Sequence, residues 1–328
     1  MRRIFASLIL LCASFFFALQ SASAVTIAWT PVGNPGNAPD TVVMTDGTTG
    51  YGSVPYSYNI GTYDVTNSQY VAFLNSNDPT GADPLGLYNS SMSSAPRGGI
   101  NYNSGAANGS KYSVMPGNGN HPVNFVSWYD AIRFTNWLNN GRVPGSTETG
   151  AYTILGGTPT PSNGLSITRN AGAMVFLPNE NEWYKAAFYN PATSSYFQYP
   201  TSSDTAPTAE APPGGSNSAN YNSNDFVGNL TDAGAYTGTM SPYGAFDMGG
   251  NVYQWTETLL DRLEREIRGG AFDTASDALL SSNRNAVDPP VTLSGGIGFR
   301  VASVPEPSTG VLVVAACGLM WVLRKRFK

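Results

Sequence analysis

The sequence predicts an α+β domain built from three short helices, short strands and many loops. Three segments of about ten residues each show helical periodicity behind a start signal. The rest of the chain shows only short apolar runs, which favour short strands. Residues 90–120 and 201–220 are rich in Gly, Asn, Ser and Pro, a composition typical of surface loops.

Two of the predicted helices begin with a capping-box pattern. Thr66 is followed three positions later by Gln69, and Asn179 is followed in the same way by Glu182. The side chain of the first residue can accept from the backbone N–H of the second, whose own side chain reaches back. Pro191 should halt the second of these helices.

The remaining helix begins after Ser127, which we expect to be its N-cap, and Gly141 is the expected stop. In the same region, His121 is the chain's one histidine. We expect His121 to have a structural role. A Ser-His-Asp arrangement with Ser127 and Asp130 stays open, although no spacing signature supports it.

The N-terminal end indicates export. Arg2 and Arg3 precede an apolar run over 4–19, and Ala22-Ser23-Ala24 fits a small-residue cleavage site. We therefore expect residues 1–24 to be a signal peptide that signal peptidase removes. The alternative is an uncleaved anchor, for which the run is short.

The C-terminal end carries a second apolar segment. Pro305-Glu306-Pro307 precedes a predicted transmembrane helix at about 310–323, and a basic cluster follows it. Positive charge stays on the cytoplasmic side, so the main domain should lie outside. Fourteen residues give about 21 Å of helix, less than the hydrocarbon core of about 30 Å. A permanent tail anchor is the alternative, and it would usually be longer.

This tail resembles the PEP-CTERM sorting signal that exosortases read, in which the same three features occur in the same order. The resemblance covers 304–328 and implies an exosortase partner, a transient stay in the inner membrane, and delivery to the cell surface or an extracellular matrix.

Charge and cysteine content exclude several function classes for the segment between these ends. Residues 25–304 hold 11 Lys and Arg against 21 Asp and Glu, a formal net charge of −10. Such a surface argues against a nucleic-acid partner, which requires basic patches. Both cysteines, Cys12 and Cys317, lie in the end segments, so the domain has no thiol for a disulfide, a metal or redox chemistry.

Ordered aromatic-rich motifs run through the domain. They are IGTYDVTNSQY at 60–70, HPVNFVSWYDA at 121–131, LPNENEW at 177–183, YGAFDMGGNVYQW at 243–255, RGGA at 268–271 and GFR at 298–300. In this order they resemble the formylglycine-generating, sulfatase-modifying enzyme family, over about residues 27–303. The resemblance implies a C-type-lectin-like α+β fold for a domain spanning 25–303.

The chemistry of that family is expected to be absent. Its enzymes oxidise a substrate cysteine with two cysteines that bind copper, and Thr274 and Leu279 stand at those positions here. A soft Cu(I) ion needs thiolates. A related branch holds iron with three histidines, which one histidine cannot replace. We expect no copper site, no iron site and no catalytic residue.

Calcium is the metal that the resemblance does imply. One site of the family maps to Gly250 and Val252 as carbonyl ligands, with Gln254 in place of the usual Glu, a change that should weaken binding. A second site would map to neighbouring positions in the preceding loop. These are Asn220, Tyr221, Asp225 and Phe226. Turn-forming residues without an ion are the alternative at both sites.

The remaining charged positions are predicted to be structural. Arg268 and Arg300, inside the closing motifs, should tie loops together through carbonyls and carboxylates. Glu180 and Glu182 favour the dipole at a helix start over a catalytic pair. Residues 261–266, with alternating acidic and basic side chains, are predicted to be a solvated face.

These observations predict an exported surface or matrix protein whose domain binds a glycan or another surface protein and catalyses nothing. The alternative is an oxidoreductase of the formylglycine-generating type, or another oxygenase of the superfamily.

Overall fold

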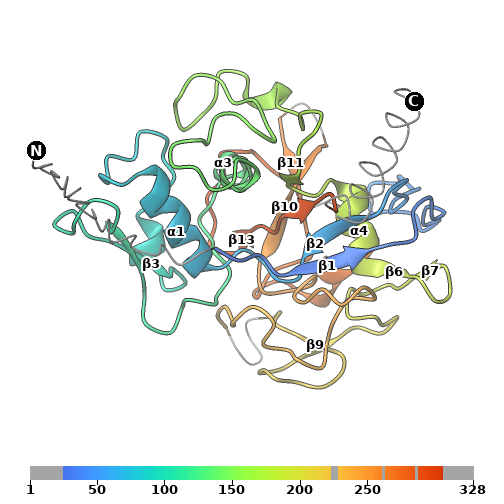
Figure 1. The fold of residues 1–328 in the computed structure, drawn as a ribbon. Coiled ribbons are helices and arrows are strands. Elements are labelled where there is room, and N and C mark those ends of the chain that lie inside the picture. The colour runs from blue at the N-terminus through green and yellow to red at the C-terminus, as the bar shows by residue number, and fades with distance from the viewer. Residues whose placement is uncertain (1–24, 223–227, 261–262, 285–286, 306–328) are drawn as a thin grey trace, which may run out of the picture.

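A computed structural model describes residues 25–222, 228–260, 263–284 and 287–305, and it confirms the α+β class (Figure 1). The three predicted helices are present, and the described residues add a single-turn helix and two 3-10 turns. The helices are α1 (Asn67–Asn77), α2 (Ser91–Ser94), α3 (Trp128–Asn139) and α4 (Glu180–Phe188), with turns η1 (Gly164–Ser166) and η2 (Ser276–Leu279).

All three predicted N-caps are confirmed. Thr66 and Asn179 form complete capping boxes, as predicted, and Ser127 forms one as well, with Asp130 as its reciprocal partner. Gly141 follows α3 in the left-handed region at φ +69°. The last helix, α4, ends at Phe188, because the chain turns there into a short strand before it reaches the proline.

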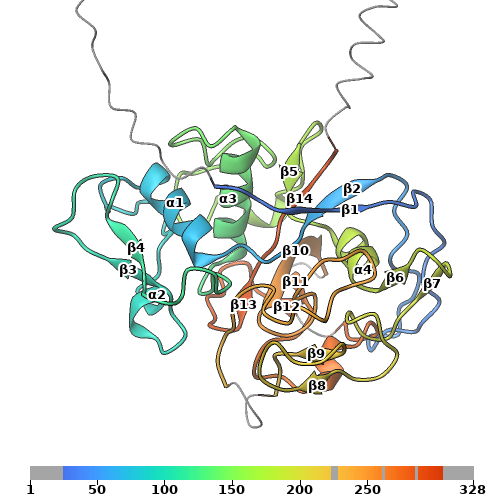
Figure 2. The same ribbon diagram turned by 60° about the horizontal axis from the view of Figure 1, so that its bottom comes forward.

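The first sheet joins the two ends of the described domain. Its strands, in spatial order, are β1 (Trp29–Val32), β2 (Tyr58–Gly61), β14 (Ala302–Ser303) and β5 (Val175–Phe176), all antiparallel. The last strand of the domain therefore lies between two earlier ones, and Figure 2 shows β1, β5 and β14 together at the top of the molecule.

The second sheet is built around the longest strand. Its order is β12 (Val287–Asp288), β11 (Arg265–Arg268), β10 (Tyr253–Leu259) and β13 (Ile297–Gly298), and only the β10–β13 pair is parallel.

Three two-stranded ribbons complete the described strands, two of them within the stretches predicted to be loops. They are β3 (Ile100–Tyr102) with β4 (Tyr112–Val114), β6 (Tyr189–Asn190) with β7 (Ser195–Tyr196), and β8 (Thr208–Ala209) with β9 (Ser218–Ala219). The loop prediction for 90–120 and 201–220 therefore missed α2 and two strand pairs.

Aromatic side chains fill the core between α1, α3 and the sheets. Phe134 of α3 lies between Phe73 of α1 and Phe299, with ring centroids 5.4 and 5.3 Å apart. Trp128 and Trp255 are fully buried, and their indole N–H groups donate to backbone carbonyls at 2.9 and 3.0 Å. A second cluster surrounds α4.

The predicted ends of the chain lie outside the described residues. This holds for the signal peptide at 1–24, for the transmembrane helix at about 310–323, and for Glu306 and Pro307 of the sorting motif, whose Pro305 is the last described residue. In the part of the chain that the structure describes, no helix is long and apolar enough to cross a bilayer.

Candidate functional site

The motifs converge on Arg300, which is fully buried. Its guanidinium donates to the amide oxygen of Gln254 at 2.6 Å, to the carbonyl of Gly61 at 2.9 Å and to the carboxylate of Asp64 at 3.0 Å. The same amide oxygen accepts from the indole of Trp183 at 2.6 Å. Four motifs that are distant in the sequence therefore share one buried hydrogen-bond network. This agrees with the prediction that Arg300 ties loops together.

Asp64 is only partly satisfied in this network. One carboxylate oxygen contacts Arg300, whereas the other is buried without a hydrogen-bond partner. Burial raises the pKa of Asp64 to about 8 despite the attraction of the guanidinium. Arg268 is also structural, since it donates to the carbonyls of Ser281, at 3.0 Å, and Asn283.

Thr274 and Leu279, the two residues predicted to replace the family's cysteines, lie side by side. A Cβ built on Gly270 would lie 3.0 Å from the hydroxyl of Thr274 and 2.7 Å from a methyl of Leu279. The Thr274 hydroxyl is held at 3.0 Å from both backbone groups of Ala271. Leu279 is fully buried and packs in an apolar cluster with Tyr199.

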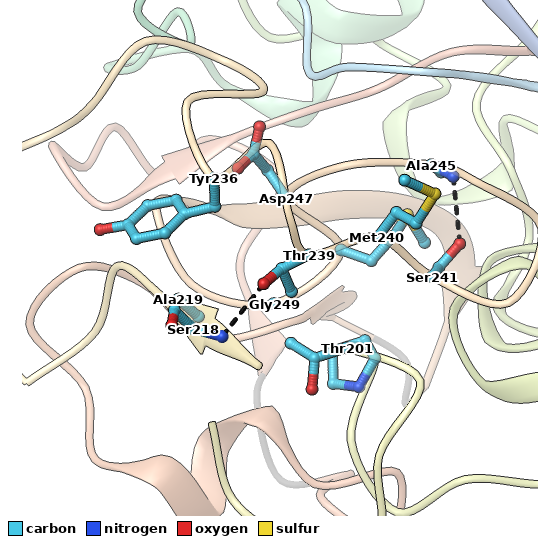
Figure 3. A pocket seen from close by; sticks show the side chains of 12 residues that line it. Thr201, Ser218, Ala219, Tyr236, Thr239, Met240, Ser241, Ala245, Asp247 and Gly249 are labelled. Atoms are coloured by element: carbon cyan, nitrogen blue, oxygen red, sulfur yellow. Dashed lines mark hydrogen bonds between the residues drawn. The ribbon is translucent and has the colours of Figure 1, made fainter. Parts of the chain in front are cut away.

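A small pocket adjoins these positions (Figure 3). It is lined by Thr201, Ser218, Thr239, Ser241, Asp247 and Gly249 among others, and its volume of about 10 Å³ is room for about one water molecule. The backbone of Gly249 faces Leu279, which a Cβ there would approach to 3.4 Å.

The hydroxyls of the pocket are engaged in holding its own loops. Ser218 N–H donates to Thr239 at 3.1 Å, Ala245 N–H donates to Ser241 at 3.2 Å, and Thr201 donates to an amide oxygen at 2.6 Å. Figure 3 shows the first two of these bonds across the pocket. The pocket is therefore a place where loops are hydrogen-bonded to one another, and it is too small to be a substrate cavity.

Asp247 is the acidic group of this pocket. Its carboxylate accepts from the N–H of Gly234 at 2.5 Å, and burial raises its pKa to about 6. Its backbone carbonyl accepts from Gln254 at 2.7 Å and from Arg300 at 3.0 Å. The backbone of Asp247 therefore links the pocket to the buried network.

The side chain among the predicted calcium ligands at 250–254 is engaged elsewhere. Gln254 is fully buried, and its amide oxygen already accepts from an indole and from a cationic guanidinium. Val252 is buried in an apolar cluster. Gly250 lies against the backbone of Asn220, which brings residues of the two predicted sites together.

The second predicted calcium site is described only in part. Tyr221 donates its hydroxyl to the carbonyl of Pro207, and Asp225 and Phe226 lie outside the described residues. Within the described ranges, no group of three or more His, Cys, Asp or Glu side chains could hold a metal ion. Calcium binding stays a prediction.

The hypothetical Ser-His-Asp arrangement is not assembled. Ser127 donates to Asp130 at 2.7 Å, but this pair forms the cap of α3. The imidazole of His121 lies 3.6 Å from the carboxylate of Asp232 instead, and desolvation lowers the pKa of this histidine, which opposes the positive charge that an ion pair requires.

The carboxylates at the start of α4 are structural, as predicted. Glu182 accepts from the backbone N–H of Asn179 at 2.7 Å and from Arg169 at 2.7 Å. Glu180 forms an ion pair with Arg284 at 2.7 Å.

The prediction of a solvated charged face at 261–266 was wrong for its described buried members. Glu266 is fully buried and Arg265 is 3% exposed. They lie on β11, an inner strand of the second sheet, where the guanidinium of Arg265 lies 3.8 Å from the ring of Trp128 and Glu266 accepts from Thr256. Stacking and hydrogen bonds replace part of the hydration that the sequence pattern suggested, while Arg265 Nε and Glu266 Oε1 are buried without a hydrogen-bond partner. Residues 261–262 lie outside the described ranges.

Solved structures of similar fold are known. CarF has a TM-score of 0.56 at 20% identity, covering 86% of this chain and 100% of CarF. Treponema denticola variable protein 1 has a TM-score of 0.53 at 19% identity, covering 87% and 98%. At these identities the likeness concerns the fold alone. No protein of curated function matches the chain.

The sequence also matches a family model over most of its length. The model is described as the sulfatase-modifying factor enzyme 1-like domain, and it matches residues 31–304. This confirms the resemblance of the domain, whereas the sorting-signal resemblance stays a prediction. The chain belongs to the sulfatase-modifying factor enzyme 1-like family.

Proposed function

We propose that the chain is an exported surface protein whose domain uses the family scaffold to bind a glycan or a surface protein and lacks the family's copper chemistry. The observation that carries this proposal is that the side chains of Thr274 and Leu279 both lie beside Gly270. Thr274 and Leu279 stand together where family enzymes have their two thiols.

Neither side chain can replace a thiolate. The Thr274 hydroxyl is engaged by Ala271, and Leu279 has no lone pair and is buried among apolar side chains. Cu(I) selects soft sulfur ligands, so oxygen activation by the family route has no ligand set here. The adjoining pocket has room for about one water molecule, which is too little for a cysteine side chain.

A peptide-conversion assay tests the loss of catalysis. The purified chain is incubated with copper and a peptide that carries the sulfatase cysteine motif, and the product mass is measured. We expect no conversion. Formylglycine in the peptide would overturn the proposal and establish the oxidoreductase alternative.

A matched variant tests whether the site is placed correctly. Because both side chains contact Gly270, the double substitution Thr274→Cys with Leu279→Cys should create a pair of thiols that binds Cu(I), and the native chain should bind none at this site. Serine at both positions is the control, since it is similar in size to cysteine but lacks sulfur.

Ligand binding and cellular location are tested by separate measurements. Glycan arrays and pull-downs from surface material with the folded native chain should each be run, and a chain that retains nothing in either would contradict the binding role. We further propose delivery through the C-terminal signal. Cell fractionation with and without the exosortase should show a shorter, surface-located product only when the exosortase is present.

A further inference from the structure

The outer face of the first sheet lies beside both ends of the domain. Strand register places Thr30, Ile60, Ala302 and Phe176 in one row, and all four are buried. Side chains alternate between the faces of a strand, so the neighbouring row lies on the other face of the sheet, where all members except the buried Ser303 are partly or fully exposed. That row contains Pro31, Asn59, Ser303 and Val175, and Trp29 shares its parity on β1.

Two hollows flank Trp29 on this side of the molecule. They have volumes of about 320 and 230 Å³ and share Trp29 and Val175. Val25, the first residue after the predicted signal peptide, lines one hollow, and Val304, which precedes Pro305, lines the other. Both predicted end segments therefore join the domain on the same side, next to adjacent hollows.

This surface, which we call the end face, comprises Trp29, Arg142, Met174, Val175 and Val304. Neither hollow is lined by an acidic side chain. Arg142, which lines the larger hollow, is the one charged residue among the lining residues of the two. Met174 is 38% exposed. The domain has a net charge of −10, so a surface lined by one basic and no acidic side chain is less negative than the domain average.

The sequence beyond Pro305 limits how far the end face can lie from a bilayer. The apolar run begins at Val311, six residues further on, and six extended residues span at most about 20 Å. If the run lies in the hydrocarbon, the end face lies within that distance of it, of which the headgroup layer takes up about 5–7 Å. The tether therefore holds this face close to the lipid.

We propose that the end face contacts the bilayer surface while the C-terminal segment is inserted. The inference rests on the proposed export and membrane insertion. Trp29 and Met174 supply the amphipathic and apolar side chains that suit the interface, and Arg142 is attracted to lipid phosphates. The hydroxyl- and loop-rich side around β8 and β9, opposite in Figure 2, is then left free for ligands.

Single-cysteine labelling of the full chain tests this orientation. The described domain has no cysteine, so Met174→Cys and Thr208→Cys, each with Cys12 and Cys317 changed to Ser, place one dye on the end face or on exposed β8. The chain is reconstituted in vesicles of phosphatidylcholine and phosphatidylglycerol with quencher-bearing lipids. We expect the dye at 174 to lose several-fold more fluorescence than the dye at 208.

The outcomes separate the inference from the tether beneath it. A chain that does not sediment with the vesicles overturns the tether, and the inference falls with it. A chain that sediments with equal quenching at the two positions overturns the inference alone. A dye at 174 that is shielded from both lipid-borne and water-soluble quenchers also overturns it, because another segment or a second copy then covers the face.

A charge variant gives an independent measurement. Arg142→Glu should reduce the lipid quenching of the dye at 174 by several-fold, whereas Arg142→Lys should retain it, since a lysine keeps the attraction to phosphate. Equal quenching in the two variants would contradict the role of Arg142.

Discussion

Gly250 lies where two backbone segments come closest together. Its φ is +80°, and a Cβ there would lie 2.3 Å from the carbonyl oxygen of Asn220, which also accepts from the N–H of Asn251 at 2.8 Å. Gly47 has almost the same φ, +82°, with nothing within 4 Å. The two glycines therefore differ in contact and not in backbone conformation.

This pair gives a residue-scale prediction. Gly47→Ala should cost only the strain of a positive φ, about 1–2 kcal/mol in the free energy of unfolding. Gly250→Ala should cost about 1–3 kcal/mol more, because the backbone of Asn220 must move. Urea denaturation of both variants measures the difference. Equal losses would show that the close approach is unimportant.

Arg300 is the second residue whose loss should be severe. Arg300→Ala removes the guanidinium that donates to the Asp64 carboxyl and to the Gly61 carbonyl, and each buried group left unsatisfied typically costs about 1–3 kcal/mol. Arg142→Ala is the control, because that side chain is exposed and should change stability by less than about 0.5 kcal/mol. Guanidinium denaturation compares them, and losses of similar size would contradict the structural role.

At the scale of elements, α1 depends on its cap. Gln69 N–H is held by the hydroxyl of Thr66, whose own N–H donates to the side chain of Gln69 at 2.9 Å. Thr66→Ala should therefore lower stability by about 1 kcal/mol. Ser68→Ala, two residues further along the chain and exposed, should leave stability nearly unchanged. Thermal unfolding of both checks this, and a cap variant as stable as the control would contradict it.

The caps could be predicted from sequence because each depends on residues three positions apart. The strands could not. Ala302 is paired with both Ile60 and Phe176, and nothing local in a two-residue strand specifies partners that lie so far along the chain. The same limit explains Glu266, whose charge suggested solvent until the sheet placed it on an inner strand.

The candidate site shows the same division. Family resemblance predicted that Thr274 and Leu279 replace the thiols, and the structure places them together on Gly270. It could not predict that Gln254 is occupied by Trp183 and Arg300, because hydrogen-bond partners follow from the tertiary fold and not from residue type.

For the molecule as a whole, buried carboxylates should make stability depend on pH. Burial raises the pKa of Asp64 to about 8, and raises that of Asp130 and of Asp247 to about 6. An unfolded aspartate titrates near about 3.9. Between these values the native state holds protons that the unfolded chain has released, so each rise in pH favours unfolding.

The stability that these protonated groups contribute to the folded state is fully present below about pH 4. It is lost as the pH rises through the folded-state pKa of each group, and the last to be passed is the pKa of Asp64, at about 8. We therefore expect the free energy of unfolding to fall between about pH 5 and 9. His121, whose pKa is lowered, works in the opposite direction around its own titration. A substitution is needed to isolate the aspartate.

Asp64→Asn supplies that substitution, because an amide resembles the protonated acid and cannot lose a proton. The variant should be about as stable as the native chain near pH 5 and should gain on it progressively toward pH 9, as measured by urea unfolding at several pH values. Asp204→Asn, at an exposed side chain that accepts from the backbone N–H of Gln198, should keep the native slope. If Asp64→Asn also keeps that slope, Asp64 is ionised throughout and its contact with Arg300 outweighs its burial.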